Sequence, residues 1–224
     1  AGLVPFALGT DTAGSGRVPA AFNHLVGFKP TKGRWSTRGL VPACRTLDCI
    51  TVFTDDTADA RLVDEVIASF DQEDPFSKAL ADAPVKPRTF GVPRRDQRNF
   101  FGDLESEYLY GRALEKLAEL GDVVEIDYAP LQEAALLLYG GPWVAERTAA
   151  MADILATNPE AVDPTVREVV EKGVPMTAVD LFNGIYRLAE LKRYADTLWS
   201  EIDVMVFPTA GTTYRVAEML AAPV

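Results

Sequence analysis

The sequence is poor in the residues that build metal sites and disulfide frameworks. It holds two cysteines, Cys44 and Cys49, and one histidine, His24. This set is too small for the cysteine and histidine sites that bind structural zinc. No apolar run is long enough to span a bilayer, and no signal-peptide pattern occurs. We therefore expect reduced cysteines packed near the functional site, no metal or other cofactor, no membrane partner and a cytoplasmic protein.

Basic residues are scarce beside acidic ones. The 224 residues contain 22 lysines and arginines against 33 aspartates and glutamates, which gives a formal net charge of −11. Binding to nucleic acid or to an anionic membrane needs clustered lysine and arginine, so both are disfavoured as partners. The hydrophobic share of 48% and the charged share of 25% are ordinary for a globular protein. The length allows one or two domains.

One segment carries most of the reactive chemistry of the chain. Residues 9–20 read Gly-Thr-Asp-Thr-Ala-Gly-Ser-Gly-Arg-Val-Pro-Ala and follow an apolar run at 3–8, which predicts a buried strand. Small residues around Ser15 would leave its hydroxyl open, and Gly14 and Gly16 tolerate backbone angles that other residues avoid. We interpret Ser15 as a candidate nucleophile, which needs a base to take its proton.

The same segment offers backbone donors for the charge that forms on an attacked carbonyl oxygen. A substrate could approach four of them, the amides of Thr12, Ala13, Gly14 and Ser15. Asp11 and Arg17 flank the turn and could pair to brace it. On spacing alone, an ordinary polar loop is the alternative. The pattern lacks the Gly-Lys-Ser/Thr of a phosphate loop and the first glycine of a Gly-x-Ser-x-Gly elbow.

The sequence does not identify a clear general base for Ser15. His24 lies in Ala-Ala-Phe-Asn-His-Leu-Val-Gly and is expected to enter a strand, packed or partly exposed rather than catalytic. Lys29 and Lys32 are the nearest lysines downstream, but Pro30 fixes a turn directly after Lys29. We therefore expect the base to lie outside these residues.

Residues 9–20, followed by Val-Gly-Phe-Lys-Pro-Thr at 26–31, resemble the core of the amidase signature family. That family hydrolyses amides with a serine nucleophile, a second serine on a cis peptide bond, and a lysine. The resemblance implies that Ser15 is the nucleophile and that the amides of residues 12–15 form the oxyanion hole. It also implies that the lysine and the cis-serine, in a Gly-Gly-Ser-Ser-Gly-Gly stretch, fall before Ala1.

Two further segments, 36–49 and 138–147, resemble the branch of the family that hydrolyses allophanate. In that branch, the tyrosine and the arginine that match Tyr139 and Arg147 contact the substrate. Allophanate is a urea that carries a carboxylate, and a guanidinium fork suits a carboxylate through two parallel hydrogen bonds. The resemblance therefore implies that Tyr139 and Arg147 bind the substrate.

The local sequence is compatible with this role. If Pro142 opens a helix, Arg147 lies inside that helix and Tyr139 just before it, so that both could face one pocket. The alternative is a surface ion pair between Arg147 and Glu146 or another acid. Such a pair would indicate nothing about substrate binding and would contribute little to stability.

Periodicity and turn signals predict an α/β protein with a mixed β-sheet covered by helices. An apolar stripe in the first expected helix is predicted to be core, namely Leu62, Val63, Val66, Ile67 and Phe70. The expected helices are 55–70, 105–120, 130–138, 142–156, 164–172 and 176–201. The expected strands after residue 54 are 89–92, 123–126 and 204–207.

The resemblance extends from Ala1 to Val224 and implies one partial amidase domain over 1–224, incomplete at both ends. It implies hydrolysis of allophanate to ammonia and carbon dioxide in urea or cyanuric acid catabolism. The partner implied is a biotin-dependent urea carboxylase, either as a separate protein or as a fused domain. A homodimer is also compatible with the resemblance. Without the lysine and the cis-serine, the isolated residues are expected to be inactive. The alternatives are a general amidase, the glutaminase subunit of a tRNA amidotransferase, and a non-catalytic truncated product.

Overall fold

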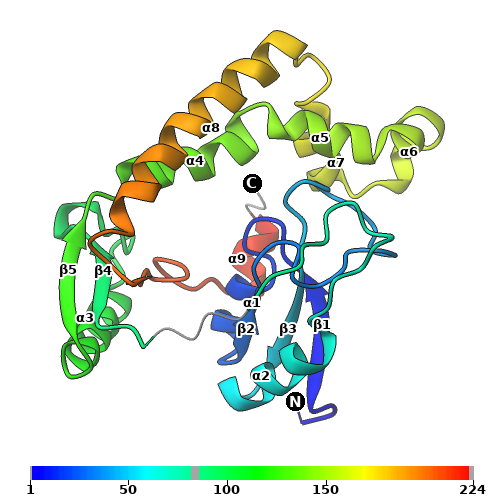
Figure 1. The fold of residues 1–224 in the computed structure, drawn as a ribbon. Coiled ribbons are helices and arrows are strands. Elements are labelled where there is room, and N and C mark those ends of the chain that lie inside the picture. The colour runs from blue at the N-terminus through cyan, green and yellow to red at the C-terminus, as the bar shows by residue number, and fades with distance from the viewer. Residues whose placement is uncertain (1, 82–85, 222–224) are drawn as a thin grey trace. The chain divides into compact units, whose positions relative to one another are not determined.

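The computed structural model describes residues 2–81 and 86–221 (Figure 1). The chain divides into two compact units. The first comprises residues 1–83 with 149–151, and the second comprises residues 84–148 with 152–224. Within the described ranges, none of the helices combines the length and the apolar content needed to cross a membrane.

The first unit contains an antiparallel sheet of strand order β1-β3-β2 (Figure 1). Its strands are β1 (Phe6–Thr10), β2 (Val26–Phe28) and β3 (Ile50–Thr54). The central strand β3 is largely buried, whereas most of β1 is exposed. The prediction of a buried strand from the apolar run at 3–8 is therefore wrong for this structure. In the described part of the chain, β1 is an edge strand that pairs with β3 alone.

Two helices, α1 (Arg17–Phe22) and α2 (Thr57–Ile67), belong to the same unit. The side chain of Asp56 caps α2 by accepting a hydrogen bond from the amide of Asp59 at 2.9 Å. The core of the unit is a buried cluster of Trp35, Val52 and Ala60, the last of which lies on α2.

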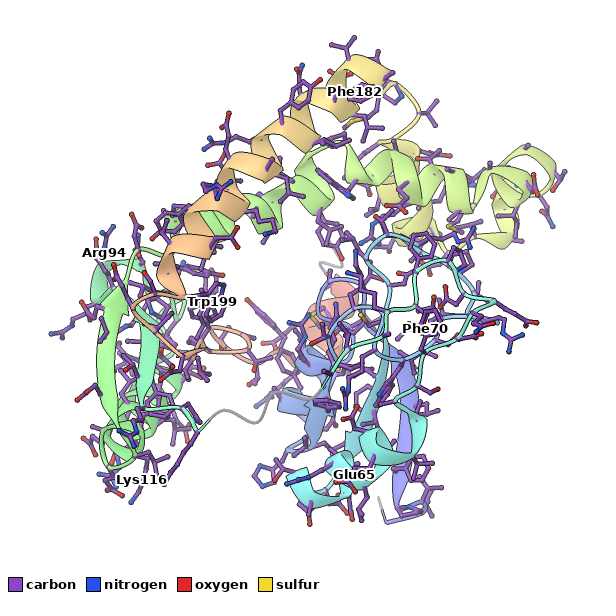
Figure 2. All side chains as sticks on the ribbon, viewed as in Figure 1. Glu65, Phe70, Arg94, Lys116, Phe182 and Trp199 are labelled. Carbon is purple, nitrogen blue, oxygen red and sulfur yellow. The ribbon has the colours of Figure 1, made fainter. Side chains whose placement is uncertain are left out.

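The apolar stripe of α2 is only partly in the core. Val63 and Ile67 pack against the buried cluster, but Leu62, Val66 and Phe70 are 59%, 84% and 55% exposed. The core prediction is thus wrong for these three residues. Leu62 and Val66 lie one helical turn apart, on a side of α2 next to the side that faces the sheet. Phe70 (labelled in Figure 2) lies beyond the end of α2 at Ile67.

The second unit contains a parallel sheet of strand order β5-β4-β6. Its strands are β4 (Thr89–Pro93), β5 (Asp122–Ile126) and β6 (Val204–Met205). Helix α3 (Leu104–Ala118) connects β4 to β5, and Figure 2 shows Arg94 at the carboxyl end of β4 and Lys116 on the last turn of α3. The strands predicted at 89–92 and 123–126 are confirmed, and the last one ends two residues earlier than predicted.

Further helices make up most of the second unit. A capping box between Thr177 and Asp180 starts the longest of them, α8, along which α4 packs. The predicted helix at 142–156 is divided into α5 and α6 at Met151. The helices are α4 (Ala129–Gly140), α5 (Trp143–Ala150), α6 (Ala152–Thr157), α7 (Pro164–Glu171), α8 (Ala178–Leu198) and α9 (Val216–Ala221), with short 3-10 turns at Arg95–Gln97 and Pro159–Ala161.

The fold class is confirmed as α/β with both parallel and antiparallel strand pairs. The mixture arises because the antiparallel pairs belong to one sheet and the parallel pairs to the other. Sequence patterns identify strands but do not assign them to sheets, because pairing depends on contacts between distant residues.

Candidate active site

Ser15 lies in the bend between strand β1 and helix α1. The ladder of β1 continues one step beyond Thr10, where the amide of Asp11 donates to the carbonyl of Cys49 at 2.9 Å, and the chain then leaves the sheet. Helix α1 begins at Arg17. The side chain of Ser15 is exposed, and its hydroxyl makes no hydrogen bond within the described residues. The nucleophile candidate is therefore open to a reactant.

The backbone amides on this bend are also open. In the described part of the chain, no acceptor receives a hydrogen bond from four of them, those of Thr12, Ala13, Gly14 and Ser15. The next two amides, of Gly16 and Arg17, both donate to Oδ2 of Asp11, at 3.1 and 3.2 Å. Free donors beside an exposed hydroxyl can hold the negative oxygen that forms when an acyl carbon is attacked.

Asp11 fixes the bend from inside. Its carboxylate is fully buried and receives a bidentate pair from Arg17, with Nε to Oδ2 at 2.9 Å and Nη2 to Oδ1 at 3.0 Å. The pair that the sequence suggested is thus present. Lys29 adds a third contact, from Nζ to Oδ1 at 3.3 Å. Burial alone would raise the pKa of Asp11, but the hydrogen bonds from Arg17 and the charge of Lys29 outweigh burial and lower it well below its usual range.

The candidate bases in the chain are placed elsewhere. Lys29 Nζ contacts Asp11 and also donates to the carbonyl oxygen of Thr12 at 3.2 Å. His24 is exposed in the turn after α1, with φ of 55°, so the expectation that it enters a strand is wrong. Since Ser15 Oγ has no partner in the described residues, neither side chain is hydrogen-bonded to it.

The glycines of the bend provide space rather than unusual backbone angles. Gly16 has φ of −94° and Gly14 is not in the positive-φ region either, so the interpretation from backbone freedom is wrong. A Cβ atom on Gly16 would lie 2.5 Å from Cγ2 of Thr51. Thr51 is fully buried on β3 and donates to the carbonyl of Phe28 at 2.6 Å, so it has little room to move.

Replacing Gly16 with alanine should therefore destabilise the protein by about 1–3 kcal/mol, the usual cost of overpacking. Gly14→Ala is the matched control, because its Cβ would meet only Val18 Cγ2, at 3.4 Å. We expect it to change the free energy of unfolding by less than about 0.5 kcal/mol. Denaturant unfolding measures both values. Equal effects of the two substitutions would contradict the packing argument.

Both cysteines are buried thiols outside any disulfide, as expected. Cys49 lies beside the bend, since its carbonyl accepts from the Asp11 amide. Burial raises the pKa of the Cys49 thiol, while the charge of Lys29 acts in the opposite direction. A buried thiol with a raised pKa is a poor nucleophile. Among the residues described, no group of three histidine, cysteine, aspartate or glutamate side chains could hold a metal ion.

Asp48 is a member of the site that sequence reasoning missed. Its carboxylate is 3% exposed and accepts a hydrogen bond of 2.6 Å from Oγ1 of Thr12. It also accepts from the amides of Ala43 and Cys44 at 2.9 and 3.1 Å. The same residue lines a cavity of about 250 Å³ in the first unit, together with Arg38, Arg45 and others. No local pattern around Asp48 could have indicated this contact, because Thr12 is 36 residues away.

The other two predicted site residues meet in the second unit. Arg147 lies in α5, which starts directly after Pro142 as expected, whereas Tyr139 lies in the last turn of α4 rather than in a loop. The guanidinium carbon of Arg147 is 4.6 Å from the centroid of the Tyr139 ring. Such stacking fixes the plane of the guanidinium group.

The guanidinium of Arg147 has unused donors. Its Nε and Nη2 atoms are buried and have no hydrogen-bond partner in the described residues. Burying such donors without a partner costs free energy, which an anionic ligand would recover. Nε and Nη2 are also the two nitrogens that can bind one carboxylate side by side.

Comparisons with known proteins identify the family of this chain. The family profile described as Amidase matches residues 1–220. The urea amidolyases of Lachancea kluyveri and Saccharomyces cerevisiae are 41% and 38% identical over 229 residues, which cover all of this chain and 12% of each relative. The structure of Kluyveromyces lactis allophanate hydrolase matches all of this chain with a TM-score of 0.94 and 40% identity, and 37% of that chain is covered. The chain thus spans about an eighth of these two urea amidolyases, and it belongs to the amidase signature family.

Proposed function

We propose that this chain carries the nucleophile of an enzyme that hydrolyses allophanate to ammonia and carbon dioxide, in urea or cyanuric acid catabolism. Ser15 Oγ attacks the amide carbonyl, the amides of residues 12–15 bind the oxyanion, and the terminal nitrogen leaves as ammonia. Water then releases the acyl group from Ser15 as N-carboxycarbamate, which breaks down to two carbon dioxide molecules and a second ammonia. The observation that carries this proposal is the exposed hydroxyl of Ser15 beside backbone amides, none of which has a hydrogen-bond partner within residues 2–81 and 86–221.

Allophanate is favoured as substrate for two reasons. The solved structure reported above is named an allophanate hydrolase and is 40% identical to this chain. In addition, Arg147 presents two buried nitrogens that have no hydrogen-bond partner among the residues described, and Tyr139 stacks on its guanidinium group. We propose that this pair binds the carboxylate, which distinguishes allophanate from neutral amides.

The proposed function also concerns the base for Ser15 and the source of the substrate. The base for Ser15 belongs, by family resemblance, to residues outside this chain, so we propose that these 224 residues alone do not hydrolyse amides. The proposed partner is a biotin-dependent urea carboxylase, which would supply allophanate as a separate protein or as a fused domain. The resemblance to urea amidolyases, of which this chain spans 12%, supports a fused arrangement.

Replacing Arg147 with alanine in the whole gene product should lower kcat/KM for allophanate by about 10²- to 10³-fold, because two charged hydrogen bonds are lost. Arg147→Lys should recover little, since an ammonium group lacks the planar fork. Turnover of biuret, in which an amide replaces the carboxylate, should change far less. Initial rates on both substrates measure this shift in preference.

Arg112→Ala is the matched control for this test. Arg112 is an exposed arginine of the same unit that pairs with Glu115 on α3. Its removal should leave both rates unchanged. If Arg147→Ala keeps near-normal allophanate turnover, the substrate assignment is wrong, and a general amidase or an amidotransferase glutaminase subunit becomes the better reading.

A further inference from the structure

We infer that Lys29 and Asp48 are positioning residues of the oxyanion hole. Together they hold Thr12 at two points and so fix the direction of the Ala13 N–H. The inference rests on the proposed function, because it assigns roles to two side chains in amide hydrolysis by Ser15. Neither side chain touches the reacting atoms in this role; both act through the backbone of Thr12.

Thr12 is held by its side chain and by its carbonyl group. Its hydroxyl donates to Oδ1 of Asp48 at 2.6 Å, and its carbonyl oxygen accepts from Nζ of Lys29 at 3.2 Å. Asp48 is buried and the side chain of Lys29 is 19% exposed, so solvent competes little with either bond. Charge-assisted hydrogen bonds in such surroundings are stronger than neutral ones.

The contact with Lys29 determines where the next amide points. In a trans peptide the C=O and the N–H point in opposite directions, and no described peptide bond is cis. Since the Thr12 carbonyl is turned toward Lys29, the Ala13 N–H of the same peptide unit is turned away from Lys29. Ala13 is exposed, and its amide meets no acceptor in the described residues.

Both holding groups are themselves fixed before any substrate binds. Asp48 accepts from the amides of Ala43 and Cys44, which anchors its carboxylate to its own loop. Lys29 also contacts the buried carboxylate of Asp11. A donor aimed in advance avoids reorganisation when the charge develops, and such preorganisation is the main contribution of an oxyanion hole to the rate.

The contacts of Lys29 also argue against its acting as the base for Ser15. Its Nζ donates to two oxygens, Oδ1 of Asp11 and the carbonyl oxygen of Thr12, and not to Ser15 Oγ. A base for Ser15 must instead be neutral and within hydrogen-bond reach of the hydroxyl. The geometry gives Lys29 an electrostatic and orienting function.

The test compares Thr12→Val with Thr12→Ser in the whole gene product. Valine keeps the shape but loses the hydroxyl, so we expect kcat to fall by about 10- to 100-fold with KM within about 3-fold of wild type. Serine retains the hydroxyl and should restore kcat to within about 3-fold. Lys29→Met and Asp48→Asn should lower kcat in the same way.

A double variant and a control sharpen the result. Thr12→Val and Asp48→Asn weaken the same hydrogen bond, so the double variant should be no slower than the slower single variant. Thr54→Val is the control, because Thr54 is another buried threonine, 2% exposed, whose hydroxyl donates to the Asp56 carbonyl at 2.7 Å. It should lose stability in thermal unfolding but keep kcat.

The outcomes separate this inference from the function on which it rests. If wild type is active, Ser15→Ala is not, and Thr12→Val and Lys29→Met keep wild-type kcat, the positioning roles are wrong while the function stands. An effect on KM alone, or no rescue by Thr12→Ser, also overturns them. If Ser15→Ala keeps full turnover or wild type hydrolyses no amide, the proposed function is wrong and the inference falls with it. Should Asp48→Asn fail to fold, the Thr12 pair decides.

Discussion

Replacing Ser15 with alanine in the whole gene product should reduce amide hydrolysis by about 10³-fold or more, the usual loss when one member of a catalytic unit is removed. The fold should be unaffected. Ser15 is exposed and its hydroxyl makes no hydrogen bond in the described residues, so alanine removes no contact that stabilises the bend. A large loss of rate with no change in unfolding free energy is therefore the expected signature.

Ser69→Ala is the matched control for Ser15→Ala. Ser69 is exposed, and its hydroxyl donates only a long hydrogen bond, 3.4 Å, to the carbonyl of Ile67. Its removal should leave both rate and stability unchanged. A fluorophosphonate that reacts with activated serines should label wild type and the Ser69 variant but not the Ser15 variant. Retained turnover in Ser15→Ala would show that another group is the nucleophile.

The local geometry around the candidate nucleophile could be predicted because its contacts are local. Ser15, the free amides beside it and the Asp11–Arg17 pair all lie within residues 9–20, and the spacing of that segment already determines which groups are neighbours. The stacking of Arg147 on Tyr139 is similar, since only eight positions and one helix boundary separate the two residues.

The contacts that hold the segment in place could not be predicted in the same way. Asp48 reaches Thr12 because β3 pairs with β1, which brings residues 36 positions apart into contact. The sequence offers Lys29 as a candidate base, and only the structure shows that its Nζ donates to Asp11 and Thr12. Such contacts depend on strand register, which no periodicity in a single strand reveals.

Burial was harder to predict than secondary structure. The pattern of α2 correctly indicates a helix, but an apolar stripe wider than the contact face leaves Leu62 and Val66 exposed. The same applies to Phe6 and Leu8 of β1, which are 45% and 53% exposed at the edge of the described sheet. Apolar sequence shows what can be buried, and the available neighbours decide what is buried.

The buried carboxylate of Asp11 leads to the second large effect. Five donors converge on it: the amides of Gly16 and Arg17, two nitrogens of the Arg17 side chain, and Lys29 Nζ. Asp11→Asn keeps the shape but leaves one acceptor oxygen, and its NH₂ group would face other donors. Breaking a buried ion pair by removing one partner costs about 3–5 kcal/mol, and we expect about 3 kcal/mol because Arg17 is half exposed.

The stabilising contribution of the Asp11 carboxylate depends on pH, and the direction follows from its pKa. The pKa of Asp11 is lower in the folded protein than the value of about 3.9 of an unfolded aspartate. Its stabilising contribution is therefore fully present above about pH 4, and it is lost as the pH falls through the lower, folded-state pKa. Between pH 7 and pH 4 the deficit of Asp11→Asn should stay constant, and below that range the variant should approach wild type.

Urea unfolding of wild type and Asp11→Asn over a series of pH values measures this difference. Glu65→Ala is the control: Glu65 (labelled in Figure 2) is exposed and pairs with Arg61 on α2, so its loss should cost less than about 0.5 kcal/mol. Because Asp11 also fixes the bend that carries Ser15, the Asn variant should lose turnover under conditions where it remains folded. A variant as stable and as active as wild type at pH 7 would show that the buried carboxylate organises neither the fold nor the site.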